Sequence, residues 1–190
     1  MKSLAPQILQ FWFGDGADYG KVHRRWFEKD PTFDALVIKH YQKLHQEMRE
    51  GGHRDWLDEA HDCLARIIVL DQFPRHIYRG SALAFSTDAL ALEAATHLVG
   101  HGWDRALLPV ERMFAYLPFE HSESLADQER ACELCRALDA FPETADTHRW
   151  ALAHRDIVHR FGRFPHRNAA LGRENTAEEV AFLKQPGSSF

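Results

Sequence analysis

The segment His154–Asn168, HRDIVHRFGRFPHRN, joins the end of an amphipathic helix to a basic turn. Apolar side chains and one histidine share one face of this helix: Trp150, His154, Ile157, Val158 and Phe161. Gly162 and Pro165 end it, because glycine readily adopts positive φ and proline cannot continue a helix. The stretch predicts a helix over about 146–161, followed by a turn.

Apolar residues recur with helical periodicity along the whole chain, and no segment shows the strict alternation of a half-buried strand. This pattern predicts an all-α protein, an antiparallel helical array of about eight helices with short loops. Caps, prolines and glycines set the expected bounds. The expected segments are 5–13, 21–28, 31–50, 56–71, 75–79, 88–99, 109–117, from 124, 146–161 and from 177. We expect one helical domain over 1–190, with 186–190 as a frayed tail.

The composition fits a soluble protein with one substantial core, since 45% of the 190 residues are hydrophobic and 27% are charged. No apolar run approaches the roughly 20 residues of a membrane-spanning helix. The start, MKSLAPQILQFWFGDG, faintly resembles a signal peptide, but Pro6 and Gln7 interrupt it and no small-residue cleavage site follows. We therefore expect a cytoplasmic protein with no membrane contact.

Basic residues gather near the C-terminus, where six arginines between Arg149 and Arg173 face one acid, Asp156. The formal net charge of the chain is −5, so this concentration is local and indicates an anionic partner. The overall acidity argues against nucleic acid as that partner.

Two short features favour structural interpretations. Cys132 and Cys135 form a C-x-x-C within a predicted helix, and no second pair completes a zinc site, so we interpret them as buried apolar side chains. The aromatic run Trp12, Phe13, Trp26 and Phe27 is likewise interpreted as core. Asp71 closes an apolar helix face, where a carboxylate needs a cation or a donor.

Four motifs together resemble the domain-of-unknown-function 924 family of mostly bacterial proteins. They are ILQFWFG (8–14), LDQFPRHIYRG (70–80), ERMFAYLPFEHSE (111–123) and HRDIVHRFGRFPHRN (154–168). The sequence departs from the usual pattern at His76 and Phe119. The resemblance covers nearly the whole chain and implies a fold akin to the tetratricopeptide superhelix, with no settled activity.

Three of these motifs each bring arginine or histidine next to a proline bend. The leading hypothesis is a pocket for a small anionic ligand, because guanidinium groups recognise phosphate and carboxylate. The predicted ligand-binding residues are Arg75, Arg112, Arg163, His166 and Arg167. The predicted orienting acids are Asp71, Glu111 and Glu120. The candidate acid/base groups are His121 and His154.

Two alternatives remain open at this stage. The chain could be a peptide-binding or protein-binding scaffold, since superhelical helix pairs offer concave grooves. The motifs could also be purely structural, with each arginine bound to a buried acid of the chain. The spacing of histidines and acids matches neither a di-iron bundle nor HExxH, so neither a metal nor a cofactor is expected. Whether the protein is an enzyme stays undecided.

Overall fold

The computed structural model describes residues 4–188, and this part of the chain contains helices and no strand. The all-α prediction is confirmed. The α-helices are α1 (Ala5–Phe13), α2 (Pro31–Arg49), α3 (Ala60–Ile67), α4 (Phe73–Ile77), α5 (Asp88–Gly100), α6 (Pro109–Glu120), α7 (Leu125–Arg136), α8 (Thr147–Phe161) and α9 (Ala177–Phe182). The 3₁₀ turns are η1 (Gly16–Asp18), η2 (Arg24–Trp26), η3 (Arg54–Leu57), η5 (Ala82–Phe85), η6 (Trp103–Ala106), η7 (Pro142–Thr144) and η8 (Pro165–Arg167).

Local capping chemistry fixes several boundaries as the sequence predicts. Asp30 Oδ1 accepts hydrogen bonds from the backbone N–H groups of Thr32 and Phe33 at the start of α2. Thr176 and Glu179 form the predicted capping box of α9. These contacts satisfy backbone donors that have no partner within the helix.

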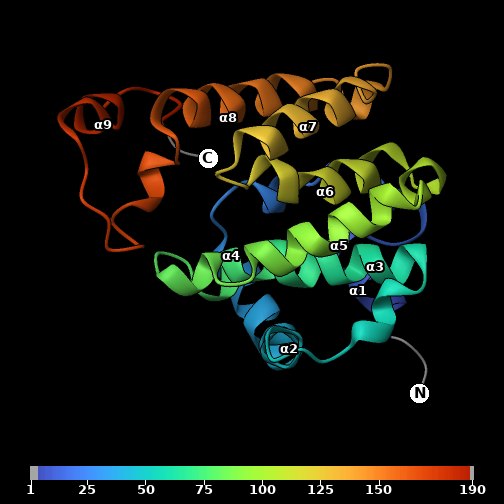
Figure 1. Ribbon diagram of the computed structural model, residues 1–190. Coiled ribbons are helices and arrows are strands. Elements are labelled where there is room, and N and C mark those ends of the chain that lie inside the picture. Colours follow the sequence, from blue (N-terminus) through green and yellow to red (C-terminus); the bar gives the residue numbers. More distant parts are fainter. Residues whose placement is uncertain (1–3, 189–190) are drawn as a thin grey trace.

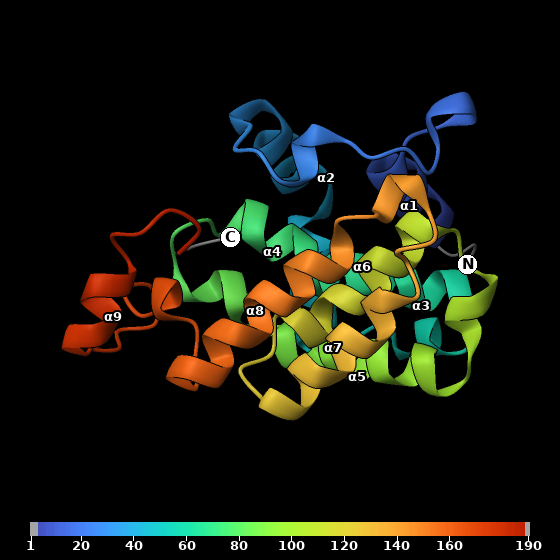
Figure 2. The same cartoon turned by 90° about the horizontal axis from the view of Figure 1, so that it is seen from above.

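The helices stack so that α3, α5, α6, α7 and α8 each pack against a neighbour in the series (Figure 1). Helix α2 packs on α4, and α1 packs on α3. Both views place α9 and the segment before it at one end of the molecule, away from α1 and α3 (Figures 1 and 2). The likeness to a tetratricopeptide superhelix remains a prediction.

Two groups of buried apolar side chains hold this arrangement. The larger core runs through the helices from α1 to α8, and its largest fully buried side chains include Trp12, Phe13 and Tyr116. The smaller one joins Phe164 to the end of α8 and to α9. No helix in residues 4–188 is long and apolar enough to cross a membrane.

A π-helix, η4 (Ile68–Gln72), joins α3 directly to α4, where the sequence predicts a bend at Phe73-Pro74. Pro74 has no N–H, so the carbonyl of Leu70 lacks its α-helical donor. The hydroxyl of Thr87 supplies one at 2.6 Å. The hydrogen bond from the start of α5 therefore stabilises the π-turn. Such turns are frequent at functional sites.

Other expected boundaries are wrong. Pro118 lies inside α6 and does not stop it, so the helix continues to Glu120. The expected helix over 21–28 is only the short turn η2, and the expected start at Trp56 is replaced by η3 and a later α3. Of the expected frayed tail, Ser188 is buried and bonds to the carbonyl of Leu183, while 189–190 lie outside the described residues.

Candidate functional site

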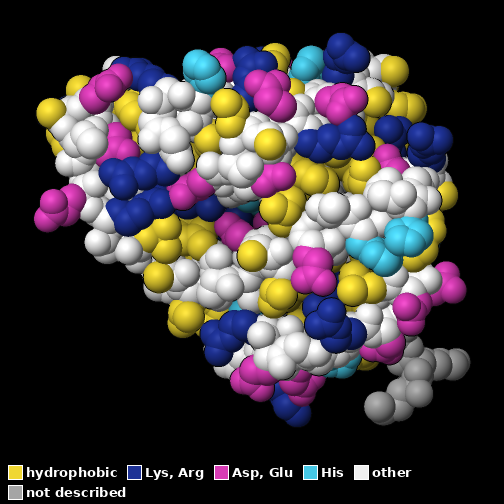
Figure 3. Space-filling model, viewed as in Figure 1, with side chains coloured by type: hydrophobic (Ala, Val, Ile, Leu, Met, Phe, Trp, Pro, Cys, Tyr) yellow, Lys and Arg dark blue, Asp and Glu magenta, His cyan; other side chains and the backbone are white. Residues whose placement is uncertain are grey.

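A cavity of about 730 Å³ lies between the helical core and the segment that follows α8. Its walls come from η2, α4, η5, α6, α8 and η8, so they are distant in sequence. The space-filling view shows basic and acidic side chains gathered on this side, where the surface is hollowed (Figure 3). The lining residues on which the site depends are Arg75, Glu120, His121, His154, His166 and Arg167.

One carboxylate, Asp88, links the arginines of two motifs. Arg75 Nη1 donates to Asp88 Oδ1 at 3.0 Å, and Arg167 Nη1 donates to Asp88 Oδ2 at 3.1 Å. Asp88 is the first residue of α5, where a negative charge also complements the helix dipole. This pairing fixes η8 against α4 and α5, although 79 residues separate Arg167 from Asp88.

The guanidinium of Arg167 is buried between two aromatic rings. Its central carbon lies 4.7 Å from the ring centroid of Phe85 and 4.7 Å from that of Phe164. Burial, and next the neighbouring charge of Arg75, lower the pKa of Arg167 to about 10, so it remains charged at neutral pH. The bond to Asp88 is the one side-chain hydrogen bond of Arg167 among the described residues, and its buried Nε has no partner there.

Asp71 lies beneath the cavity and is fully buried. His121 Nδ1 lies 2.7 Å from Asp71 Oδ1, and Arg75 Nη2 lies 3.5 Å from the same oxygen. Burial raises the pKa of the Asp71 carboxyl, but Arg75 and His121 outweigh it and hold that pKa below its usual range. Asp71 therefore stays ionised and meets the cation and donor that its position requires.

Glu120 contrasts with Asp71. It is buried, its Oε1 accepts from the thiol of Cys135 at 3.3 Å, and its Oε2 lies 3.5 Å from His154 Nδ1. Burial, together with the charge of Asp71, raises the pKa of Glu120 to about 8. A protonated Glu120 carries no charge with which to orient the arginines, and no arginine lies within ion-pair distance of it in the described chain.

The two candidate histidines differ in their partners. His154 Nδ1 donates to the backbone carbonyl of Trp150 at 2.8 Å, and burial lowers the pKa of His154 to about 3. His121 instead donates to a carboxylate. Burial, then Arg75, lower the pKa of His121, although Asp71 acts in the opposite direction. Both rings are therefore neutral at pH 7.

Three predicted site residues lie away from the cavity. Arg163 forms a two-point contact with Glu179 at the start of α9, with distances of 2.7 and 2.8 Å. Arg112 donates to the hydroxyl of Tyr116. Glu111 accepts from the hydroxyl of Tyr19 and from a backbone N–H at the start of α6. The predicted cluster is therefore corrected at these positions, since each side chain has a local partner that points it elsewhere.

The sequence does not predict every residue of the site. Asp88, which binds two arginines of the site, is absent from the predicted residues, because no local signal indicates such a pairing. Phe27 is interpreted as core and Trp150 as part of an apolar helix face, but Phe27 is 63% and Trp150 is 48% exposed, and both line the cavity. Cys132 and Cys135 are buried free thiols, as predicted. No group of three metal-ligating side chains occurs within residues 4–188.

Comparison with known sequences gives the family. The family described as "Bacterial protein of unknown function (DUF924)" matches residues 8–187. The chain belongs to this family. It is also similar to a solved structure, the protein of unknown function ATU0120 from Agrobacterium tumefaciens. The two are 40% identical over 95% of this chain and 97% of that one, with a TM-score of 0.85. No protein with a curated description matches the chain.

Proposed function

We propose that this protein binds a small molecule that carries an anionic group and an apolar body. The observation that carries the proposal is Arg167, whose buried guanidinium lines the cavity and makes one side-chain hydrogen bond, to Asp88. A guanidinium has five N–H donors and recognises carboxylate or phosphate through two of them. Its burial strengthens such a contact because little water competes.

The walls of the cavity support the apolar part of the proposal. They carry large apolar side chains: Trp26, Phe27, Phe85, Met113, Leu117 and Trp150. Small-molecule pockets of roughly 300–1,000 Å³ combine such walls with a few polar groups that fix the orientation of the ligand. A volume of about 730 Å³ lies within this range.

The charge balance limits the ligand. Arg75 and Arg167 are opposed by Asp71 and Asp88, so the site has no large excess of positive charge. We therefore propose a ligand with a single anionic group, a carboxylate in the first instance, that contacts Arg167 and leaves Asp88 in place.

Isothermal titration calorimetry with 4-hydroxybenzoate tests this proposal. The wild-type protein should bind this aromatic carboxylate, and Arg167→Gln should weaken binding at least tenfold. Arg163→Gln is the matched control, because Arg163 lies outside the cavity. Absence of binding to wild type, or equal binding to the Arg167 variant, contradicts the proposal. Circular dichroism of each variant verifies folding.

A structural role is the second candidate for part of the basic block. Arg163 binds Glu179 and so connects two parts of the C-terminal segment. Arg173 binds Glu123 at 2.7 and 2.9 Å and so connects this segment to the loop before α7. Under this proposal Arg163→Gln and Arg173→Gln lower the melting temperature and leave 4-hydroxybenzoate binding unchanged. A variant that binds more weakly while melting normally would argue against it.

A further inference from the structure

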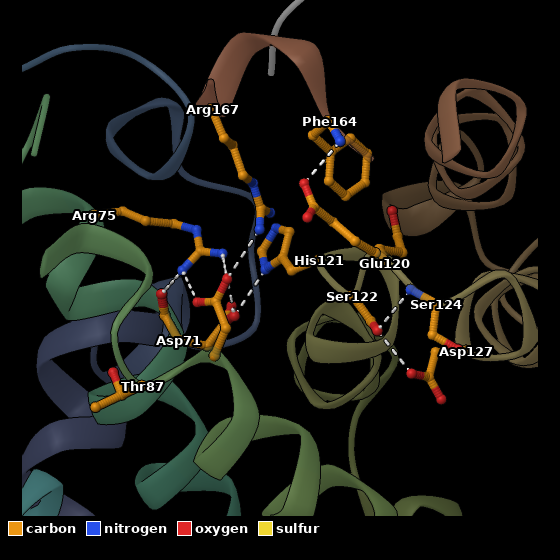
Figure 4. Close-up of polar contacts among 12 residues, drawn as sticks. Asp71, Arg75, Thr87, Glu120, His121, Ser122, Ser124, Asp127, Phe164 and Arg167 are labelled. Carbon is orange, nitrogen blue, oxygen red and sulfur yellow. Dashed lines mark hydrogen bonds and ion pairs between the residues drawn. The ribbon is translucent and has the colours of Figure 1, made fainter. Parts of the chain in front are cut away.

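The imidazole of His121 is held in one defined orientation at the cavity. Its Nδ1 lies 2.7 Å from Asp71 Oδ1, and an ionised carboxylate can only accept, so Nδ1 carries the proton. In the neutral ring Nε2 then has a free lone pair. Asp71 lies between His121 and Arg75 (Figure 4). The side-chain amide of Gln72 also donates to it.

This arrangement is the one that a general base requires. A buried carboxylate selects the tautomer of the imidazole, orients it, and stabilises the imidazolium that forms when Nε2 accepts a proton. His154 does not share it, because its Nδ1 donates to a backbone carbonyl and its nearest carboxyl, Glu120, lies 3.5 Å away. Of the two candidate histidines, His121 is therefore the one whose contacts suit a general base.

No side-chain nucleophile is bonded to His121 in the described contacts. Ser122 is next to it in sequence, but its hydroxyl donates to Asp127 and accepts from the N–H of Ser124. No serine or cysteine lines the cavity among the described residues, and Thr147 is the one hydroxyl there. Thr147 lies at the start of α8, with no base bonded to it in the described contacts. A covalent serine or cysteine intermediate is thus not supported.

Arg167 and His121 both line the cavity. In the ligand site proposed above Arg167 binds the carboxylate of the molecule, so that another group of the same molecule can lie near His121.

Resting on the ligand site proposed above, we propose that His121 is a general base that activates water for hydrolysis of a carboxylic ester of an anionic molecule. The water oxygen bonds to the acyl carbon, and His121 Nε2 takes its proton. The tetrahedral oxyanion then collapses, the bond from carbon to the alcohol oxygen breaks, and the imidazolium returns the proton to that oxygen. A carboxylic acid and an alcohol leave, with no change in oxidation state.

The test uses 4-acetoxybenzoate, with phenyl acetate as its uncharged counterpart, and follows hydrolysis by absorbance. Wild type should hydrolyse 4-acetoxybenzoate with saturation and in preference to phenyl acetate. His121→Gln should lose at least 100-fold in kcat, in line with the roughly 10²–10⁴-fold contribution of a general base. His159→Gln, an exposed histidine on α8, should match wild type. Asp71→Asn should lower kcat without raising KM, as expected of a positioning residue.

Calorimetry with the product 4-hydroxybenzoate separates the two proposals. Binding that persists in His121→Gln while hydrolysis is lost supports the catalytic role. Binding to wild type without saturable hydrolysis, or with equal hydrolysis by His121→Gln, overturns the catalytic role and leaves the ligand site standing. No binding to wild type overturns the ligand site, and the catalytic role with it.

A measurement on wild type covers the case in which His121→Gln does not fold. Diethyl pyrocarbonate acylates unprotonated imidazole nitrogens, and peptide mass spectrometry locates the modified histidines. Loss of hydrolysis should follow modification of His121, and 4-hydroxybenzoate should slow both. Full activity in protein modified at His121 overturns the assignment.

Discussion

Replacing Glu120 with Gln should stabilise the protein, and the gain should grow as the pH rises. In the folded state the pKa of Glu120 is raised from 4.5 to about 8, chiefly by burial. Because this pKa is higher in the folded protein, the unfolded chain loses the Glu120 proton at a lower pH than the folded protein does. The stability contributed by the protonated carboxyl is complete below pH 4.5 and is lost progressively as the pH rises towards 8. Glutamine keeps the shape of the side chain and does not titrate.

The magnitude follows from the width of this window. Each pH unit between the two pKa values is worth about 1.4 kcal/mol, so the difference between variant and wild type should widen by about 2.7 kcal/mol from pH 5.5 to 7.5. For a chain of this length that corresponds to roughly 5–11 °C in melting temperature. Other titrating groups contribute equally to both proteins and cancel in the difference.

Urea denaturation of both proteins at pH 5.5, 6.5 and 7.5 measures this difference. Glu129→Gln is the control, because Glu129 is exposed on α7 and its replacement should change stability by less than about 0.5 kcal/mol at every pH. A constant difference between Glu120→Gln and wild type across the range would refute the reasoning, since it would show that Glu120 is ionised in the folded protein.

Three further predictions follow from the same contacts. Asp88→Asn should lower the free energy of unfolding, measured in urea, by on the order of 2–4 kcal/mol, because Arg75 and Arg167 lose their shared carboxylate. The same change should tighten 4-hydroxybenzoate binding about tenfold, because it removes a charge that repels the ligand. Unchanged stability and affinity would contradict the shared pairing. Thr87→Val should lower the free energy of unfolding by about 1–3 kcal/mol, because the carbonyl of Leu70 in the π-helix loses its donor. A smaller decrease, measured by urea denaturation, would show that this hydrogen bond does not support the π-turn. Burial lowers the pKa of His45 and of His166 to about 4 and that of His154 to about 3, so stability is lost as the pH falls below 6.5. In the Glu120→Gln background each of the three histidines should lower the free energy of unfolding by about 2 kcal/mol between pH 7 and pH 5, and equal values at the two pH values would contradict these shifts.

The cavity could be anticipated only in part. Arg75, His121, His154, His166 and Arg167 line it, as the convergence of three motifs predicts. The same argument assigned Arg163 to the pocket, and the structure places it on Glu179 instead. Both arginines flank Pro165, so the sequence offers no basis for separating their roles.

Sequence alone determined where most helices lie and how several of them begin, because periodicity and capping depend on residues within one or two turns. Asp30 and Thr176 act within three residues of themselves, and the bounds Ala5–Phe13 follow from a local pattern. Prolines are a less reliable guide to where a helix ends. Pro118 lies inside α6, which continues to Glu120 because tertiary packing supports it.

Only the tertiary structure decided which charges meet. Asp88 pairs with Arg75 and with Arg167, 79 residues away, and Asp71 pairs with His121, 50 residues away. Such pairs form when packed helices bring side chains within about 3 Å, and burial then sets which groups stay ionised. Sequence periodicity predicts neither how the helices pack nor which groups burial keeps ionised. The ionised Asp71 and the protonated Glu120 can therefore be distinguished only in the folded chain.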